Sequence, residues 1–427
     1  MADGRAPEAE LCVEGGVVWS VSTRFGVAEH QEQSLLPPFV RALNQTLPEE
    51  ILWKVFSMSA GRTVMMLSVS KTVRRAMKRT RLPAVVRALS GRELGPSFEL
   101  TGKLAGMLAW CSVTTLDLPR CGIKGREPLE RFADFLVQCG ALAHLNMAGN
   151  RIGPTGAGLV AKAAEHCPCL THLDLSDNSM GAKGAAHLAE YLPRYGSLVV
   201  LNLSGNGIEC QGASSLAEIL GLCRCLAVLN LASNSIDDEG AVTLGQVLGR
   251  CSKLTHLDLS GNGIEDEGAD RLACGVGQCS SLVHLNLAEN EISDHGTGAL
   301  AGALARCLWL AHLDLSRNWI EDEGAGMLAG LVGQCKELRH LNLAGNGIED
   351  TGVGMLADSL ALCHSLTSLN LNSCGIENEG AGRLAEALAH CTSLVHLDLA
   401  ENGISDEGAN MLMGALAQYN SPADVRL

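Results

Sequence analysis

A single sequence unit repeats along most of this chain with a period of 28 residues. The segment Leu-Thr-His-Leu-Asp-Leu-Ser-Gly-Asn-Gly-Ile at 254–264 is one copy, and its equivalents begin at residues 142, 170, 198, 226, 282, 310, 338, 366 and 394. One further copy begins at Val113, after a step of 29 residues. We therefore count eleven repeats over 113–427, with a truncated last strand at Val425 and Leu427. Such a period is typical of solenoids, whose units bury their apolar sides against their neighbours.

Each repeat combines a strand with a helix. The alternation of Leu257 and Leu259 indicates a strand, while Gly268 to Val276 places small and apolar residues at helical spacing. Parallel strands stack about 4.8 Å apart, whereas packed helices need about 8 to 10 Å between their axes. The helical side must therefore be the longer one. We predict an α/β solenoid that curves, with a parallel sheet inside and helices outside.

The repeat at 254–264 resembles the leucine-rich repeat, in the 28-residue ribonuclease-inhibitor-like class. That class is shared with Ran GTPase-activating proteins and with the receptor ends of intracellular immune proteins. The resemblance covers about three quarters of the chain. It implies a horseshoe with a parallel sheet on its concave side.

Three residue types recur at fixed positions of the repeat, and each has a structural explanation. Side-chain amides where the chain leaves the strand can pair with buried backbone groups; they belong to Asn150, Asn178, Asn206, Asn234, Asn262, Asn290, Asn318, Asn346 and Asn402. The glycine before each helix allows neighbouring turns to approach closely. Nine cysteines near the helix ends read as small buried hydrophobes: Cys139, Cys167, Cys223, Cys251, Cys279, Cys307, Cys335, Cys363 and Cys391.

Composition and charge restrict the function classes. The chain has 427 residues and a formal net charge of −15, and the excess of acids falls on residues 113–427. An acidic surface repels phosphate backbones, which argues against nucleic acid as the partner of this part. The start lacks the basic and apolar regions of a signal peptide, and no apolar run approaches the roughly 20 residues that cross a bilayer. We expect a cytoplasmic protein without a membrane partner, whose thiols stay reduced.

Two closely spaced cysteine pairs are candidate metal sites. The pair Cys167 and Cys169 lies two repeats from Cys223 and Cys225, about 10 Å or more away, which is too far to share one tetrahedral ion. We predict no metal and no other cofactor.

The third and fifth positions of each strand should point out of the concave face of the sheet. The third position is histidine seven times, at His144, His172, His256, His284, His312, His340 and His396, and the fifth is always Asp or Asn. Metal binding or proton transfer by this column is one interpretation. The other is a solvated, mutually hydrogen-bonded sheet surface. Because uniform repetition singles out no nucleophile and base, we expect a protein that is not an enzyme.

Departures from the repeat indicate where a ligand binds. Val200 and Val228 interrupt the histidine column with an apolar patch, and repeat eight places Arg317 and Trp319 where most repeats carry small residues. Exposed Trp and Arg are common binding anchors; alternatively, Trp319 covers a neighbouring turn. The predicted protein-binding residues are Trp319, Arg317, Val200, Val228, His256, His284, His312, His340, Glu289 and Glu291.

Acidic residues recur in the strand-to-helix loops, for example Glu265-Asp266-Glu267 and Glu321-Asp322-Glu323. Acids in the first turn of a helix complement its dipole and cap its free N–H groups, which gives most of them a local cause. Their stacking nevertheless predicts an acidic edge that a basic partner could use.

The first 112 residues do not repeat. We predict a partly disordered segment over 1–45, a helical module over 46–86, and a cap of the solenoid over 87–112. The order Leu-Pro-Glu-Glu-Ile-Leu at 47–52, a spacer, then Leu-Ser-Val-Ser-Lys at 67–71 with two arginines resembles an F-box. That family docks on a Skp-type adaptor of a cullin ubiquitin ligase, and the resemblance implies adaptor-binding residues Leu47, Pro48, Ile51, Leu52 and Val55.

The basic character of this module leaves other interpretations open. Residues 46–92 hold ten Lys and Arg against Glu49 and Glu50. The run could contact nucleic acid, direct nuclear import, or form the solvated face of a capping helix. The leading hypothesis is a protein-recognition scaffold that selects substrates for a ubiquitin ligase. The alternatives are a regulator resembling Ran GTPase-activating proteins and the sensor end of an immune receptor.

Overall fold

The computed structural model describes residues 88–90, 113–361, 363–391, 393–419 and 423–427. The chain divides into two compact units, Met1–Met58 and Ser59–Leu427, and every described residue belongs to the second. The segment predicted over 1–45 and the F-box-like module at 46–86, with its five adaptor-binding residues, lie outside the described residues.

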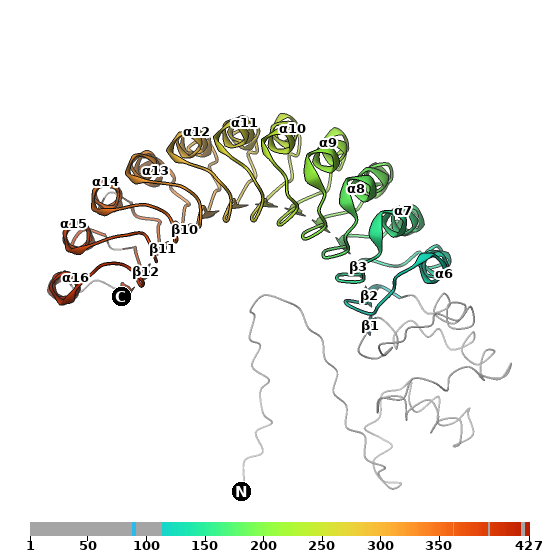
Figure 1. Ribbon diagram of the computed structural model, residues 1–427, viewed down its shortest axis with the longest axis horizontal. Coiled ribbons are helices and arrows are strands. Elements are labelled where there is room, and N and C mark those ends of the chain that lie inside the picture. Colours follow the sequence, from blue (N-terminus) through green and yellow to red (C-terminus); the bar gives the residue numbers. More distant parts are fainter. Residues whose placement is uncertain (1–87, 91–112, 362, 392, 420–422) are drawn as a thin grey trace, which may run out of the picture. The chain divides into compact units, whose positions relative to one another are not determined.

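Strands of three residues alternate with helices along the described repeats (Figure 1). The strands are β1 (Ala88–Ser90), β2 (Thr115–Asp117), β3 (His144–Asn146), β4 (His172–Asp174), β5 (Val200–Asn202), β6 (Val228–Asn230), β7 (His256–Asp258), β8 (His284–Asn286), β9 (His312–Asp314), β10 (His340–Asn342), β11 (Ser368–Asn370), β12 (His396–Asp398) and β13 (Asp424–Arg426). The helices are α6 (Arg126–Leu136), α7 (Gly153–Ala164), α8 (Gly181–Ala189), α9 (Glu209–Leu220), α10 (Asp238–Leu248), α11 (Asp266–Val276), α12 (Asp294–Leu304), α13 (Asp322–Gln334), α14 (Asp350–Leu360), α15 (Asn378–Leu388) and α16 (Asp406–Tyr419), with a 3₁₀ turn, η4, at Leu192–Arg194.

Among the described residues, the thirteen strands form one sheet in chain order from β1 to β13. Every neighbouring pair is parallel, and equivalent residues pair, as Leu285 does with Leu313. Strand β13 pairs with β12, and Val425 lies beside Leu397, where the truncated last strand was predicted. The parallel solenoid predicted from the 28-residue period is confirmed.

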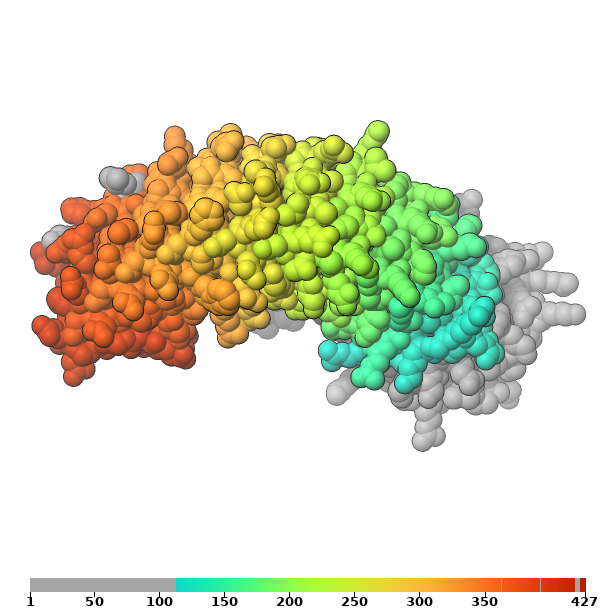
Figure 2. Space-filling view, turned by 45° about the horizontal axis from the view of Figure 1, so that its top comes forward, coloured from blue at the N-terminus to red at the C-terminus, as the bar shows by residue number. Residues whose placement is uncertain are grey.

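The strands lie on the inner side of an arc and the helices on its outer side (Figure 1). The space-filling view shows neighbouring repeats packed without a break along this arc (Figure 2). The leucines that alternate with polar residues, such as Leu285 and Leu287, are buried between the sheet and the helices. Burying such side chains removes apolar surface from water, and each repeat completes the core of the next.

Asparagine side chains connect the repeats where the chain leaves each strand. Asn206 donates from Nδ2 to the carbonyls of Leu175 and Leu203, at 2.9 and 2.8 Å, and its Oδ1 accepts from the N–H groups of Asn178 and Met180. Asn206 is 2% exposed, so these bonds satisfy backbone groups that water cannot reach. The predicted role of the asparagines is confirmed.

The recurring glycine was predicted before each helix but lies in its first turn, where it packs closely against its own loop and the preceding repeat. A Cβ atom at Gly184 would stand 2.6 Å from Cβ of Met180 and 3.2 Å from Cα of Pro154 in the preceding repeat. Eight of the nine cysteines in the shared register are buried, and Cys223 is half-buried. Burial raises the pKa of the Cys279 thiol to about 12, and the thiol donates to the carbonyl of Leu248 at 3.0 Å. These cysteines are therefore packing residues.

No helix in the described part of the chain is both long and apolar enough to cross a membrane.

Candidate protein-binding surface

The inner face of the sheet presents two rows of polar side chains. In each repeat strand from β2 to β12 the central leucine is buried, while the residues on either side of it are exposed or half-buried. This alternation follows from the period of two along a strand. The outward direction predicted for the third and fifth positions is therefore confirmed.

The histidines of the third position stack face to face in two groups. The rings of His144 and His172 lie 4.1 Å apart, centroid to centroid. In the second group, His256 to His284 spans 5.6 Å, His284 to His312 spans 5.3 Å, and His312 to His340 spans 4.3 Å. Val200 and Val228 separate the two groups, and Ser368 separates His340 from His396. The stacking follows from the parallel register, which places equivalent side chains side by side.

In the second group, His256 and His312 have lowered pKa values, mainly because they are partly buried. Burial, and then the neighbouring His340 and His284, lower the pKa of His312 to about 4. Burial and His284 also lower the pKa of His256. The Thr255 hydroxyl donates to the carbonyl of Ala227 at 3.0 Å and lies 2.8 Å from Nδ1 of His256, so Nδ1–H of His256 is the donor in that second bond. Nε2 of His256 is then left as an acceptor for a ligand.

The fifth-position row has a local structural task. Oδ1 of Asp314 accepts from the N–H and the hydroxyl of Ser316, two residues further on, at 2.9 and 2.6 Å. Oδ2 of the same carboxylate accepts from Nδ2 of Asn342 in the next strand, at 2.9 Å. These bonds hold the turn at the end of each strand. The described residues contain no group of three or more His, Cys, Asp or Glu that could hold a metal ion.

Repeat eight exposes the side chains that the sequence singled out. Trp319 is 59% exposed. Its backbone N–H donates to the carbonyl of Ile292, in the corresponding loop of the preceding repeat, at 2.9 Å. Its backbone is therefore part of the loop stack, but most of the indole lies in solvent. Nη1 of Arg317 donates to Glu289 at 2.7 Å, and Glu291 is exposed without an ion pair among the described residues.

Val200 and Val228 pair across strands β5 and β6, as predicted, and both are half-buried. The patch that they form is therefore small.

Sequence reasoning missed a second exposed tryptophan, at the end of repeat seven. Leu308 and Trp309 lie in the turn between α12 and β9 and are 76% and 61% exposed. Other repeats carry mostly small or polar residues at these two positions, for example Ser280 and Ser281, so the departure from the pattern was the available signal. Along the chain, an exposed indole therefore stands on each side of strand β9, one at the end of repeat seven and one in repeat eight.

The acidic loops cap helices differently from the prediction. We expected the acids to cap their own helix, but the carboxylate at the start of one helix accepts hydrogen bonds from the next repeat. Oδ1 of Asp266 accepts from the N–H groups of Ser293 and Gly296, at 2.8 and 2.9 Å. Asp237 alone among the N-cap residues of α6 to α15 accepts from its own helix, at the N–H of Gly240. The period of 28 residues brings consecutive helix starts together, so the carboxylate reaches the neighbouring loop.

Comparison with known proteins gives the family. A family model described as Leucine Rich repeat matches ten segments, which together make up more than half of the chain: 142–161, 166–189, 197–217, 222–245, 250–273, 278–301, 306–329, 334–357, 362–385 and 390–413. A search of the curated proteins gave no match.

Several solved structures are similar to this chain. An internalin, InlF of Listeria monocytogenes, is 18% identical over 92% of this chain and 98% of its own, with a TM-score of 0.48. The mouse RP105/MD-1 complex is 17% identical over 73% of this chain and 46% of that chain, with a TM-score of 0.42. The TLR13–ssRNA13 complex is 20% identical over 74% of this chain and 39% of that chain, with a TM-score of 0.44. On the family model and the repeat architecture, the chain belongs to the leucine-rich repeat family.

Proposed function

We propose that this protein is a non-enzymatic recognition scaffold that holds another protein on the inner sheet face and the adjoining loops of repeats six to nine. The observation that carries the proposal is the pair of exposed indoles on either side of strand β9, Trp309 at the end of repeat seven and Trp319 in repeat eight. Indole rings left in solvent are unfavourable for an isolated chain and are frequent anchors of protein interfaces. In the same part of the array, the stacked histidines and Arg317 supply hydrogen-bonding groups.

The test is capture of the ligand by proximity labelling in cells, followed by affinity measurements on the purified pair. Trp319→Ala should weaken binding by more than about 1 kcal/mol, which is about fivefold in Kd. Val395→Ala, which also truncates an exposed apolar side chain, is the matched control and should leave Kd unchanged. If neither Trp319→Ala nor Trp309→Ala changes Kd, the binding surface lies elsewhere on the protein.

We also propose that the protein selects substrates for a ubiquitin ligase, through the F-box-like segment at 46–86. Its support is the order Leu-Pro-Glu-Glu-Ile-Leu at 47–52, followed by a repeat array suited to substrate capture. The purified protein should bind a Skp-type adaptor, and Ile51→Asp with Leu52→Asp should abolish that binding. Retention of the adaptor by a variant lacking 46–86 would refute the ligase role. Absence of adaptor binding would favour the alternatives, a regulator resembling Ran GTPase-activating proteins or a sensor end of an immune receptor.

A further inference from the structure

The loops that follow the strands divide into a basic end and an acidic remainder. Parallel strands place all of these loops along one edge of the sheet. The first three loops, at 119–127, 148–156 and 176–184, hold five Lys and Arg and two acids. The eight later loops, from 204–212 to 400–408, hold twenty acids and a single cation, Arg317. An anion approaching this edge is therefore repelled along most of its length and attracted only at its beginning.

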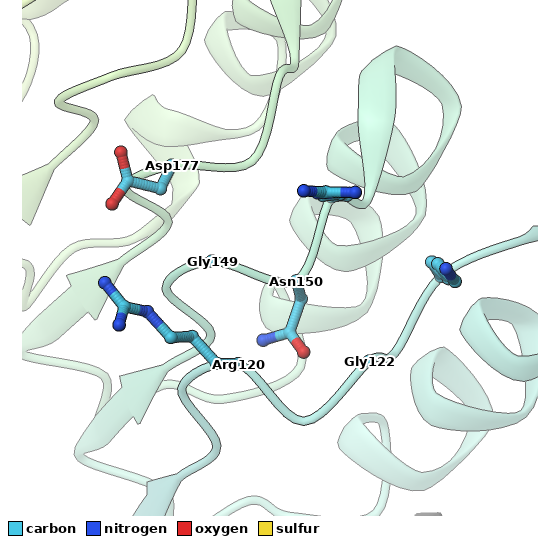
Figure 3. A pocket seen from close by; sticks show the side chains of 7 residues that line it. Arg120, Gly122, Gly149, Asn150 and Asp177 are labelled. Atoms are coloured by element: carbon cyan, nitrogen blue, oxygen red, sulfur yellow. The ribbon is translucent and has the colours of Figure 1, made fainter. Parts of the chain in front are cut away.

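The basic end contains a hollow of about 430 Å³ between the first three repeats (Figure 3). It is lined by Arg120, Gly122, Lys124, Gly149, Asn150, Arg151 and Asp177. Three of these residues are cations and one is an acid, and all four are exposed. The ligand that such a lining favours is an anion.

Backbone hydrogen bonds hold the floor of the hollow in place. The N–H of Arg120 donates to the carbonyl of Ala148 at 2.7 Å, and the N–H of Gly149 donates to Ser176 at 2.9 Å. The buried amide of Asn150 donates to the carbonyls of Leu118 and Met147 and accepts from the N–H of Ile123. The hollow is therefore fixed by the repeat stack, which lowers the entropic cost of binding a ligand there.

The Arg120 side chain is directed by packing and not by an ion pair. Its aliphatic stem passes over Gly149, where an added Cβ atom would stand 2.7 Å from Cγ of Arg120. Figure 3 shows its guanidinium on the same side of the hollow as the Asp177 carboxylate. No ion pair within the described part of the chain includes Arg120, Lys124 or Arg151, whereas Arg317 is paired with Glu289. These three cations are available to an incoming anion.

We propose that this hollow binds an acidic segment of the protein ligand, through a carboxylate or phosphate group seated among Arg120, Lys124 and Arg151. This inference rests on the proposed function, because it names the chemistry of the partner. Since the later loops are acidic, the same charge pattern sets the direction in which the ligand lies along the edge. Its acidic part is placed at the first three repeats, and a basic or neutral part continues over the later ones.

The test measures binding of short fluorescent peptides to the full chain by fluorescence polarisation. One peptide carries a run of glutamates, a second carries phosphoserine in a neutral sequence, and a third carries glutamines only. We expect the first two to bind, the third not to bind, and added salt to weaken binding. Whichever anionic peptide binds more tightly identifies the carboxylate or the phosphate as the preferred group.

Variants assign this binding to the hollow. The triple variant Arg120→Gln, Lys124→Gln, Arg151→Gln should weaken it at least about tenfold, because several charge-assisted contacts are lost together. The triple variant Arg224→Gln, Arg250→Gln, Lys253→Gln makes the same charge change at exposed residues outside the hollow and should bind like the wild type. Asp177→Asn should strengthen binding, a gain that misfolding cannot produce.

The proposal is overturned if the wild type binds neither anionic peptide, if the two triple variants behave alike, or if a single-stranded RNA fragment displaces the peptide from the hollow and binds more tightly. Failure of the proposed function gives a different result: Trp309→Ala and Trp319→Ala then leave ligand capture intact while the hollow variants still lose the peptides.

Discussion

The first repeats and the later repeats share one core but start their helices in two ways. At the residue that precedes or begins each helix, the backbone of Gly153, Gly181 and Glu209 has a positive φ of 66°, 61° and 58°. At the equivalent position from Asp237 onward the backbone is extended, with φ of −97° at Glu265. The same N–H group also changes its acceptor. In the first set, this N–H donates to the backbone carbonyl of an asparagine in the next repeat. From Glu265 onward, it donates to Oδ1 of an Asp or Asn side chain in the preceding repeat.

One side chain per repeat accounts for the change of acceptor from Glu265 onward. The acceptors in the later repeats are Asp238, Asp266, Asp294, Asp322, Asp350 and Asn378. The equivalent residues in the earlier repeats are Pro154, Ala182 and Cys210, which offer no side-chain oxygen. The buried core therefore sets the stacking of the units, while one loop residue sets the acceptor at the next helix start and adds to the charge of the edge. Asp237 is already extended although the preceding repeat carries Cys210, so the backbone conformation does not follow from that side chain alone.

The largest expected effect concerns what the two regions share. Asn206→Ala in the first set and Asn318→Ala in the second should each destabilise the protein by about 3 to 5 kcal/mol, because each leaves several buried backbone groups without partners. Urea unfolding measures this. Asn410→Ala, at an exposed residue of α16, is the control and should stay within about 0.5 kcal/mol. Clearly unequal losses at residues 206 and 318 would show that the two regions do not share one core.

The next effect tests the later loops alone. Asp266→Ala removes the acceptor of the N–H groups of Ser293 and Gly296 and should cost about 1 to 2 kcal/mol. Amide hydrogen exchange at residue 293 should rise in the same variant. Ala182→Asp introduces a carboxylate at the equivalent position of an early repeat. It should not stabilise the protein, because the N–H of Glu209, which that carboxylate would face, already donates to the carbonyl of Asn234. A stabilising Ala182→Asp would mean that the acid alone specifies the loop.

A matched pair of glycine substitutions should change stability in opposite directions. Glu209 adopts a left-handed backbone conformation that costs a side chain about 1 kcal/mol, so Glu209→Gly should stabilise by up to about 1 kcal/mol. Glu265 is equally exposed but extended, so Glu265→Gly should destabilise by a few tenths of a kcal/mol through the added freedom of the unfolded chain. Thermal unfolding of both variants checks the signs; equal signs would contradict the contrast in backbone conformation.

The last effect is a pH dependence of stability through His312 in the later repeats. The pKa of His312 is lowered to about 4 from 6.5, so the unfolded chain takes up a proton before the folded one as pH falls. This contribution to stability is complete near pH 7 and is lost progressively between pH 6.5 and 4. We expect about 1 kcal/mol at this partly exposed site. His312→Gln should therefore flatten the stability profile below pH 6.5, and an unaltered profile would contradict the lowered pKa.

Much of the molecule could be predicted from the sequence. The 28-residue period predicted the parallel sheet, the alternation at Leu257 and Leu259 predicted which residues are buried, and the recurring Asn and Gly were assigned their correct tasks. Trp319 was predicted to stand out and is exposed, whereas its role in binding stays a prediction. Trp309 was not predicted because it lies in the turn before strand β9, where the residue type varies from repeat to repeat and a single departure stands out less.

The sequence by itself determined the period, the layer order and the core, because each depends on an apolar pattern repeated eleven times, so that local deviations average out. Only the tertiary structure decided which helix start each carboxylate caps. It alone also showed that Glu209 and Glu265 differ in backbone conformation, and that Arg120, Lys124 and Arg151 line one hollow. The capping carboxylates and the hollow each join neighbouring repeats, as Asp238 and Glu265 are joined across 27 positions, so the sequence of one repeat alone does not reveal them.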